Sequence, residues 1–138
     1  MITASHLPYT RNGFKYFDKS GGGVTSSGGE ALLQKDFVLE CTRKLHQNGI
    51  SVCLDTAGNF EWSQIEELVK EVDYVLYDVK AYDENIHIKC TEVSNKRILE
   101  NLKKIDNLGK KTLIRMIIVP KMNDDINDIS IFPFLRII

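Results

Sequence analysis

The stretch Ser20-Gly21-Gly22-Gly23-Val24-Thr25-Ser26-Ser27-Gly28-Gly29-Glu30 decides how the rest of the chain is interpreted. Two glycine clusters flank a short β-prone run, and a carboxylate follows the second cluster. Glycine is favoured where the backbone takes a positive φ or where a ligand approaches it closely. The pattern therefore predicts a strand from Gly22 to Ser27, a sharp exposed turn at Gly28-Gly29, and Glu30 projecting at the mouth of a ligand site.

Two common phosphate-binding motifs do not fit this stretch. Gly23 to Gly28 has the spacing G-x-x-x-x-G, but Gly29-Glu30 stand where a P-loop needs Lys followed by Ser or Thr. The dinucleotide fingerprint G-x-G-x-x-G fails because residue 26 is serine. Since a carboxylate repels phosphate, Glu30 favours a ligand with a positive group, such as the amino group of an amino acid. The alternative is a glycine-rich turn whose glutamate faces solvent.

Length and charge restrict the class of protein. The 138 residues fit one domain with a sizeable core. Lys+Arg 18 against Asp+Glu 19 gives a net charge of −1, so the charge balance argues neither for nucleic-acid binding nor for disorder. No apolar run approaches the roughly 18 residues of a membrane span, and no signal peptide is evident. We expect a soluble cytoplasmic protein without nucleic-acid or membrane partners.

Strand and helix patterns alternate from Gly22 onward. The expected strands are 22–27, 50–55, 73–79 and 111–119, and the expected helices are 36–48, a helix from Ser63 with the capping box Ser63-Gln64-Ile65-Glu66, a weak segment 83–89, and 94–108. This alternation predicts an α/β fold with a parallel sheet of about four βα units. A closed eight-unit barrel needs about 250 residues, so the chain would form part of a (β/α) barrel or a small open sheet. Residues 1–19 are expected to be an irregular N-terminal remnant, residues 20–138 the barrel domain, and the whole a fragment.

Polar side chains follow the ends of the later strands. Asp55-Thr56 end the second strand, Asp78 and Lys80 the third, and Arg115 lies within the apolar fourth. Ligands of parallel α/β sheets bind at the carboxyl ends of the strands. Two carboxylates brought together need a cation, a proton or a basic partner, and the Thr56 hydroxyl would complete an oxygen-rich cation site. Lys80 would anchor an anionic group of a ligand, and Arg115 needs a buried partner or an anionic ligand. Taken singly, each is equally compatible with a turn or capping role.

Cysteines and histidines offer less information. Cys41, Cys53 and Cys90 are odd in number and lack a C-x-x-C pair, so they predict neither disulfides nor a metal site. Cys53 is expected to pack in the core, and His46 to contact the dipole at a helix end. The other two histidines, His6 and His87, are expected to be structural.

Several motifs in order resemble one known family. Gly21 to Thr25, Ser27 to Ala31, Cys53 to Gly58, Tyr77 to Lys80, Val93-Ser94-Asn95, and Ile114-Arg115 leading to Val119-Pro120 are similar to the glycyl radical enzyme activating enzymes, the family of the pyruvate formate-lyase activases. The similarity covers about residues 14–125. It implies a radical S-adenosylmethionine (SAM) enzyme with a partial (β/α) barrel. In such enzymes a [4Fe-4S] cluster reduces SAM, and the resulting radical abstracts hydrogen from a glycine of a partner glycyl radical enzyme.

The resemblance also implies roles for individual residues. Gly28, Gly29 and Glu30 would hold the methionine amino group, and Asp78, Val79, Lys80 and Arg115 would contact the cofactor. Asp55, Thr56 and Asp78 match a monovalent-cation site. An electron donor such as flavodoxin or ferredoxin would serve the full-length enzyme.

The chain also departs from the family pattern. The family's C-x-x-x-C-x-x-C cluster motif belongs before the glycine-rich strand, where this chain has no cysteine, so the iron-sulfur ligands are absent and the chain alone is expected to be inactive. Lys121 stands where the family often has glycine. The preferred hypothesis is the SAM-binding half of an activase. The alternatives are a degenerate module that binds a glycyl radical enzyme without chemistry, and an unrelated phosphate-binding α/β enzyme.

Overall fold

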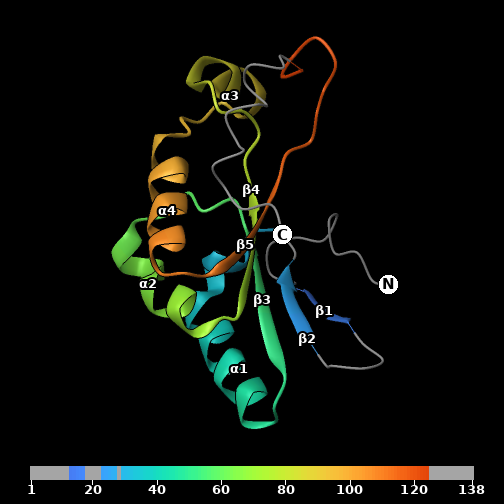
Figure 1. Cartoon of the computed structure of the whole chain (residues 1–138), viewed down its shortest axis with the longest axis vertical. Coiled ribbons are helices and arrows are strands. Elements are labelled where there is room, and N and C mark those ends of the chain that lie inside the picture. Colours follow the sequence, from blue (N-terminus) through green and yellow to red (C-terminus); the bar gives the residue numbers. More distant parts are fainter. Residues whose placement is uncertain (1–12, 18–22, 28, 125–138) are drawn as a thin grey trace.

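The fold is a five-stranded sheet with helices packed on one face (Figure 1). The computed structural model describes residues 13–17, 23–27 and 29–124. The strands are β1 (Gly13–Phe17), β2 (Gly23–Ser27), β3 (Ser51–Thr56), β4 (Tyr74–Asp78) and β5 (Lys111–Arg115), in the spatial order β1-β2-β3-β4-β5. The helices are the 3₁₀ helix η1 (Ala31–Gln34), α1 (Lys35–Gln47), α2 (Trp62–Glu71), α3 (Glu84–Thr91) and α4 (Lys96–Asn107). Strands β2 to β5 are parallel, which confirms the predicted α/β class.

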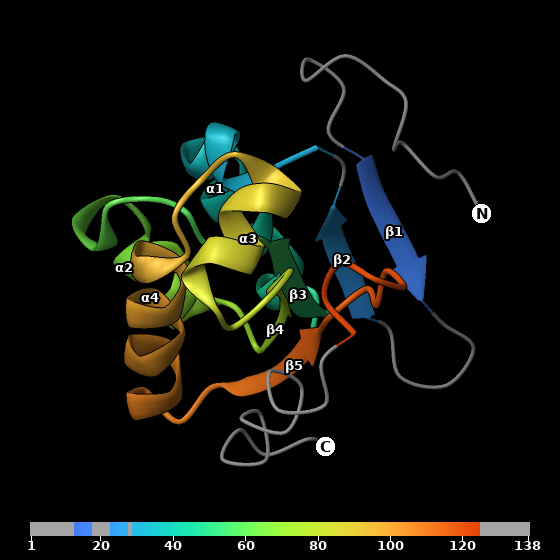
Figure 2. The ribbon, with the colours of Figure 1, turned by 90° about the horizontal axis from the view of Figure 1, so that it is seen from above.

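The core lies between the sheet and the helices. Successive side chains of a strand point to opposite faces. In β3 the buried residues alternate with half-buried ones, and Val52 and Leu54 face the helices. In β4, Val75 and Tyr77 do the same. Helices α1, α2 and α4 cover this face, whereas β1 lies at the far edge of the sheet from α4 (Figure 2). We call the opposite side of β3, β4 and β5, which no helix in the described residues covers, the open face.

Several boundaries differ from those expected. Strand β1 lies within the segment expected to be irregular, and it pairs antiparallel with β2. The capping box at Ser63 was wrong: α2 begins at Trp62, and its N-cap is Glu61 in an extended conformation. Strand β5 ends at Arg115 instead of Val119. Phe37, near the start of the expected helix 36–48, and Leu108, at the end of the expected helix 94–108, are exposed.

One carboxylate fastens the amino end of the sheet. Asp73 Oδ2 accepts hydrogen bonds from the Val52 amide at 2.7 Å and lies 2.9 Å from His46 Nε2. Burial raises the pKa of Asp73, but the hydrogen bonds from the Val52 amide and His46 lower it by more, so the pKa lies below its ordinary value. His46 therefore has a carboxylate partner in addition to its place in the last turn of α1.

No helix in the described part of the chain is long and apolar enough to span a membrane.

Candidate functional site

The predicted strand-end residues lie at one edge of the sheet. Asp78 of β4 pairs in register with Arg115 of β5, and Asp55 of β3 lies on the same face, opposite Leu76. Alternation places all three charged side chains on the open face. The parallel sheet thus brings together groups that are 23 and 37 positions apart in the sequence, Asp55 with Asp78 and Asp78 with Arg115.

Arg115 bridges the two carboxylates. Its Nε donates to Asp78 Oδ1 at 2.7 Å, and its terminal nitrogen donates to Asp55 Oδ1. Burial lowers the pKa of Arg115, but hydrogen bonding to Asp78 and the charges of Asp55 and Asp78 raise it above its ordinary value. The positive partner that two adjacent aspartates require is therefore a side chain of the protein itself.

Further polar groups extend this bridge. Lys80 Nζ lies 3.1 Å from Asp78 Oδ2, and the Ser27 hydroxyl donates to Asp55 Oδ2 at 2.9 Å. Two carboxylates, a guanidinium and an ammonium therefore form one connected network, which we call the charged cluster (Asp55, Asp78, Lys80 and Arg115). The Asp55 side chain is only 14% exposed, whereas the Arg115 side chain is 40% exposed. The cluster thus has a shielded side and a side open to solvent.

Glu30 lies beside the end of β3. Its carboxylate accepts from the Thr56 hydroxyl at 2.8 Å and from the Ala57 amide at 3.0 Å. It also caps η1 by accepting from the Leu32 amide at 3.2 Å. The carboxylate does not project free at a mouth as the sequence suggested. Burial raises its pKa above the ordinary value, although these hydrogen bonds oppose the shift.

The remaining predicted residues have separate surroundings. Gly29 has φ +62°, as the predicted turn requires, and Gly28 lies outside the described residues. Val79 is fully buried, and its amide donates to the Arg115 carbonyl at 3.0 Å. The Thr56 hydroxyl serves Glu30 and accepts from the Gly58 amide at 2.9 Å, so the hydroxyl points away from the two aspartates. The Asp55, Thr56 and Asp78 cation site stays a prediction.

The cysteines do not converge. Cys41 lies on α1, Cys53 on β3 and Cys90 on α3, and all three are free. The described residues contain no group of three or more His, Cys, Asp or Glu side chains suited to a metal ion. They do not fit a [4Fe-4S] cluster, which is held by cysteine thiolates.

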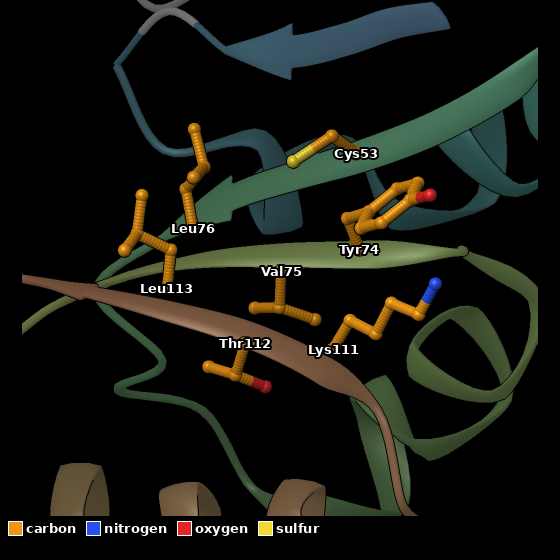
Figure 3. A pocket seen from close by; sticks show the side chains of 7 residues that line it. All are labelled: Cys53, Tyr74, Val75, Leu76, Lys111, Thr112 and Leu113. Carbon is orange, nitrogen blue, oxygen red and sulfur yellow. The ribbon is translucent and has the colours of Figure 1, made fainter. Parts of the chain in front are cut away.

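The amino half of the open face is apolar. Leu76 and Leu113 lie side by side there, with Cys53 and Tyr74 on the same side of the sheet, while Val75 and Thr112 point the other way (Figure 3). These side chains surround a shallow apolar hollow on the open face. The expectation that Cys53 packs in the core was wrong, because Cys53 is half-buried and lines this hollow. Its partial burial raises the pKa of the thiol. The whole lining consists of Cys53, Tyr74, Val75, Leu76, Lys111, Thr112 and Leu113.

Sequence reasoning missed the groups that shape the loops around the charged cluster. Asn101 of α4 donates from Nδ2 to the carbonyls of Gly58 and Phe60 at 2.8 and 2.7 Å. Gly58 has φ +70°, and an added Cβ would lie 1.8 Å from the hydroxyl of buried Tyr77. The Tyr77 hydroxyl in turn donates to the Ile98 carbonyl at 2.8 Å, which fixes the ring. Only the unusual run Ala57-Gly58 after a strand hinted at this contact.

Comparisons with known proteins agree with this arrangement. The family model of the radical SAM superfamily matches residues 11–130. The chain is 42% identical over 125 residues to a pyruvate formate-lyase-activating enzyme of Clostridium pasteurianum, covering 89% of this chain and 52% of that protein. It is 38% identical over 115 residues to a (2S)-3-sulfopropanediol dehydratase activating enzyme of Klebsiella oxytoca, covering 83% of this chain and 36% of that protein.

A solved structure supports the same relationship. The crystal structure of a domain of a pyruvate-formate lyase-activating enzyme from Bacteroides vulgatus superposes with a TM-score of 0.73 at 29% identity, covering 80% of this chain and 69% of that one. The chain spans only about a third to a half of the curated relatives named above. The family match over most of its length is decisive: the chain belongs to the radical SAM superfamily.

Proposed function

We propose that this chain forms the SAM-binding part of a glycyl radical enzyme activating enzyme, with a pyruvate formate-lyase-like enzyme as its partner. The observation that carries the proposal is the edge where the charged cluster and Glu30 meet the carboxyl ends of four parallel strands. Ligands of such sheets bind at that edge. The named relatives, which are activating enzymes, support the assignment of the partner class.

The donor set of this edge fits the methionine part of SAM. A half-buried carboxylate such as Glu30, whose pKa burial raises, is stabilised in its ionised form by a bound ammonium group. Lys80 and Arg115 supply positive charge for the ligand carboxylate. Gly29 lets the ligand approach the backbone, because no Cβ stands in its way. Gly28, Asp78 and Val79 belong to the same proposed contact set, and Asp55, Thr56 and Asp78 to a proposed monovalent-cation site.

By the resemblance, a [4Fe-4S] cluster would supply one-electron reduction of SAM in the full-length enzyme, with flavodoxin or ferredoxin as the electron donor. Because the described cysteines do not fit such a cluster, the role we assign to this chain is to bind and orient SAM.

Calorimetry with two ligands tests the proposal. SAM and 5′-methylthioadenosine share the adenosine part, but only SAM carries the amino acid. We expect Glu30→Gln to weaken SAM binding about tenfold, because one charge-assisted hydrogen bond contributes about 1.5 kcal/mol. The affinity for methylthioadenosine should stay unchanged. Equal losses for both ligands would contradict the role of Glu30. Phosphate binding without SAM binding would support an unrelated phosphate-binding enzyme. Binding of a glycyl radical enzyme without SAM binding would support a non-catalytic module.

The pH dependence of binding gives a second test. Glu30 must be ionised to attract an ammonium group, and its folded-state pKa lies above the ordinary 4.5. SAM affinity should therefore rise as the pH is raised from 4.5 through the folded-state pKa, and this rise should be absent in Glu30→Gln. An identical rise in the variant would assign the titration to another group.

A further inference from the structure

We propose that Asn123 is a positioning residue that holds Lys80 at the charged cluster. The proposal rests on the function proposed above for this edge, and it assigns a role to a residue outside the strands. The loop after β4 carries Lys80, and the segment after β5 carries Asn123. Both lie at the carboxyl end of the sheet (Figure 1).

Asn123 joins two segments by three hydrogen bonds. Its Nδ2 donates to the Lys80 carbonyl at 2.6 Å and to the Ile117 carbonyl at 2.8 Å. Its Oδ1 accepts from the Val119 amide at 2.6 Å. The residue is only 2% exposed, so all of these bonds are made away from water. A buried amide with both donors and its acceptor in use is fixed in one orientation.

A second asparagine holds the next part of the same loop. Asn95, which precedes α4, donates from Nδ2 to the Ala81 carbonyl at 3.1 Å and to the Tyr82 carbonyl at 2.6 Å. Three successive carbonyls, those of residues 80 to 82, therefore point to side-chain amides from two distant segments. No helix or strand includes these residues, so side-chain amides donate the hydrogen bonds that backbone amides donate within a helix or sheet.

This attachment matters because Lys80 is at the edge of the cluster. Its ammonium reaches Asp78 Oδ2 at 3.1 Å, and its side chain is 33% exposed. A lysine on a mobile loop would lose this contact, and its conformational entropy would fall further when a ligand binds. Fixing the Lys80 backbone at its carbonyl keeps the ammonium within reach of Asp78 and of an anionic ligand group.

The first experiment needs no ligand. Lysines are reductively methylated with ¹³C, which keeps their charge, and the Lys80 signal is assigned with Lys80→Arg. We expect Asn123→Ala to move or broaden the Lys80 signal by more than its linewidth, while the signals of Lys70 on α2 and Lys103 on α4 stay in place. Asn101→Ala, a change at an equally buried asparagine that serves another loop, should leave the Lys80 signal unchanged. An unchanged Lys80 signal in Asn123→Ala would overturn the proposal.

The second experiment is a double-mutant cycle on SAM affinity. Asn123→Ala should weaken binding about three- to tenfold, and the effect should vanish in a Lys80→Met background. A loss of the same size in both backgrounds would show that Asn123 acts on general stability. Asn123→Ser, which keeps a small polar group, replaces the alanine variant if that one does not fold. If the unmodified chain binds no SAM while the Lys80 signal still responds, the proposed function fails and the positioning role stands.

Discussion

The two faces of the sheet are built from alternate residues of the same strands, yet they differ in burial and in charge. Toward the helices, Val52 and Leu54 of β3 and Val75 of β4 are fully buried. Toward the open face, Asp55 and Arg115 carry charge, and Leu113 is 39% exposed. The helix-covered face is mostly apolar and buried, and the open face carries ion pairs beside apolar side chains.

This difference means that the buried core and the charged cluster are one residue apart along each strand. The helix-covered face supplies most of the buried apolar area and hence most of the hydrophobic stabilisation. The open face carries the partly exposed side chains of the charged cluster. Substitutions on the two faces should therefore differ in their effect on the free energy of unfolding.

The largest expected effect is on the covered side, at the contact between Gly58 and Tyr77. Gly58→Ala places a Cβ 1.8 Å from the Tyr77 hydroxyl at a residue with φ +70°. Because the buried ring is fixed by its bond to Ile98, we expect a loss of about 3 to 5 kcal/mol in the free energy of unfolding, from overlap plus backbone strain. Denaturant titration measures it.

The matched control for this change is Gly109→Ala. Gly109 has φ +68°, but nothing lies within 4 Å of an added Cβ, so only the backbone strain of about 1 to 2 kcal/mol applies. Equal losses at Gly58 and Gly109 would mean that the Tyr77 ring moves aside without cost.

The next effect compares one leucine from each face. Leu54→Ala removes a fully buried side chain from the core and should cost about 2 to 5 kcal/mol. Leu113→Ala, on the open face, should cost under about 1 kcal/mol because its side chain is already 39% exposed. Similar losses from urea unfolding of the two variants would indicate that a further part of the chain covers the open face.

The smallest effect concerns the ion pairs of the open face. Arg115→Met leaves Asp55 without its positive partner, while Asp78 keeps only Lys80. We expect a loss of about 1 kcal/mol at neutral pH, modest because solvent screens the partly exposed guanidinium. Denaturant unfolding of the unmodified chain and of the variant at neutral pH measures the loss.

A surface pair provides the control for Arg115. Arg97 lies 2.6 Å from Glu61, with both side chains about half exposed or more. Arg97→Met should change the free energy of unfolding by less than about 0.5 kcal/mol. An equal effect at both arginines would remove the distinction between the charged cluster and ordinary surface pairs.

The sequence predicted the parallel sheet because apolar runs alternate with amphipathic ones, a local property. It also indicated Asp55, Asp78 and Arg115, because charged residues at the end of an apolar strand are conspicuous. It did not predict that Arg115 bridges both aspartates, since that depends on the register between β4 and β5 and on a reach across to β3. Strand β1 was missed because its partner lies across a glycine-rich connection.

The buried asparagines could not be found from sequence for a different reason. Asn95, Asn101 and Asn123 look like ordinary surface or cap residues, because polarity alone predicts exposure. Their burial follows from the carbonyls that they meet, which come from loops distant in the chain. Only the three-dimensional arrangement shows which unpaired carbonyls need a donor.

These asparagines have a consequence for how the protein responds to acid and base. Side-chain amides do not ionise, so the ties on the loops after β3, β4 and β5 keep their strength at any ordinary pH. Glu30, whose pKa is raised by burial, does gain and lose a proton. A change of pH can therefore alter the charge at Glu30 while the amide hydrogen bonds of Asn95, Asn101 and Asn123 stay in place.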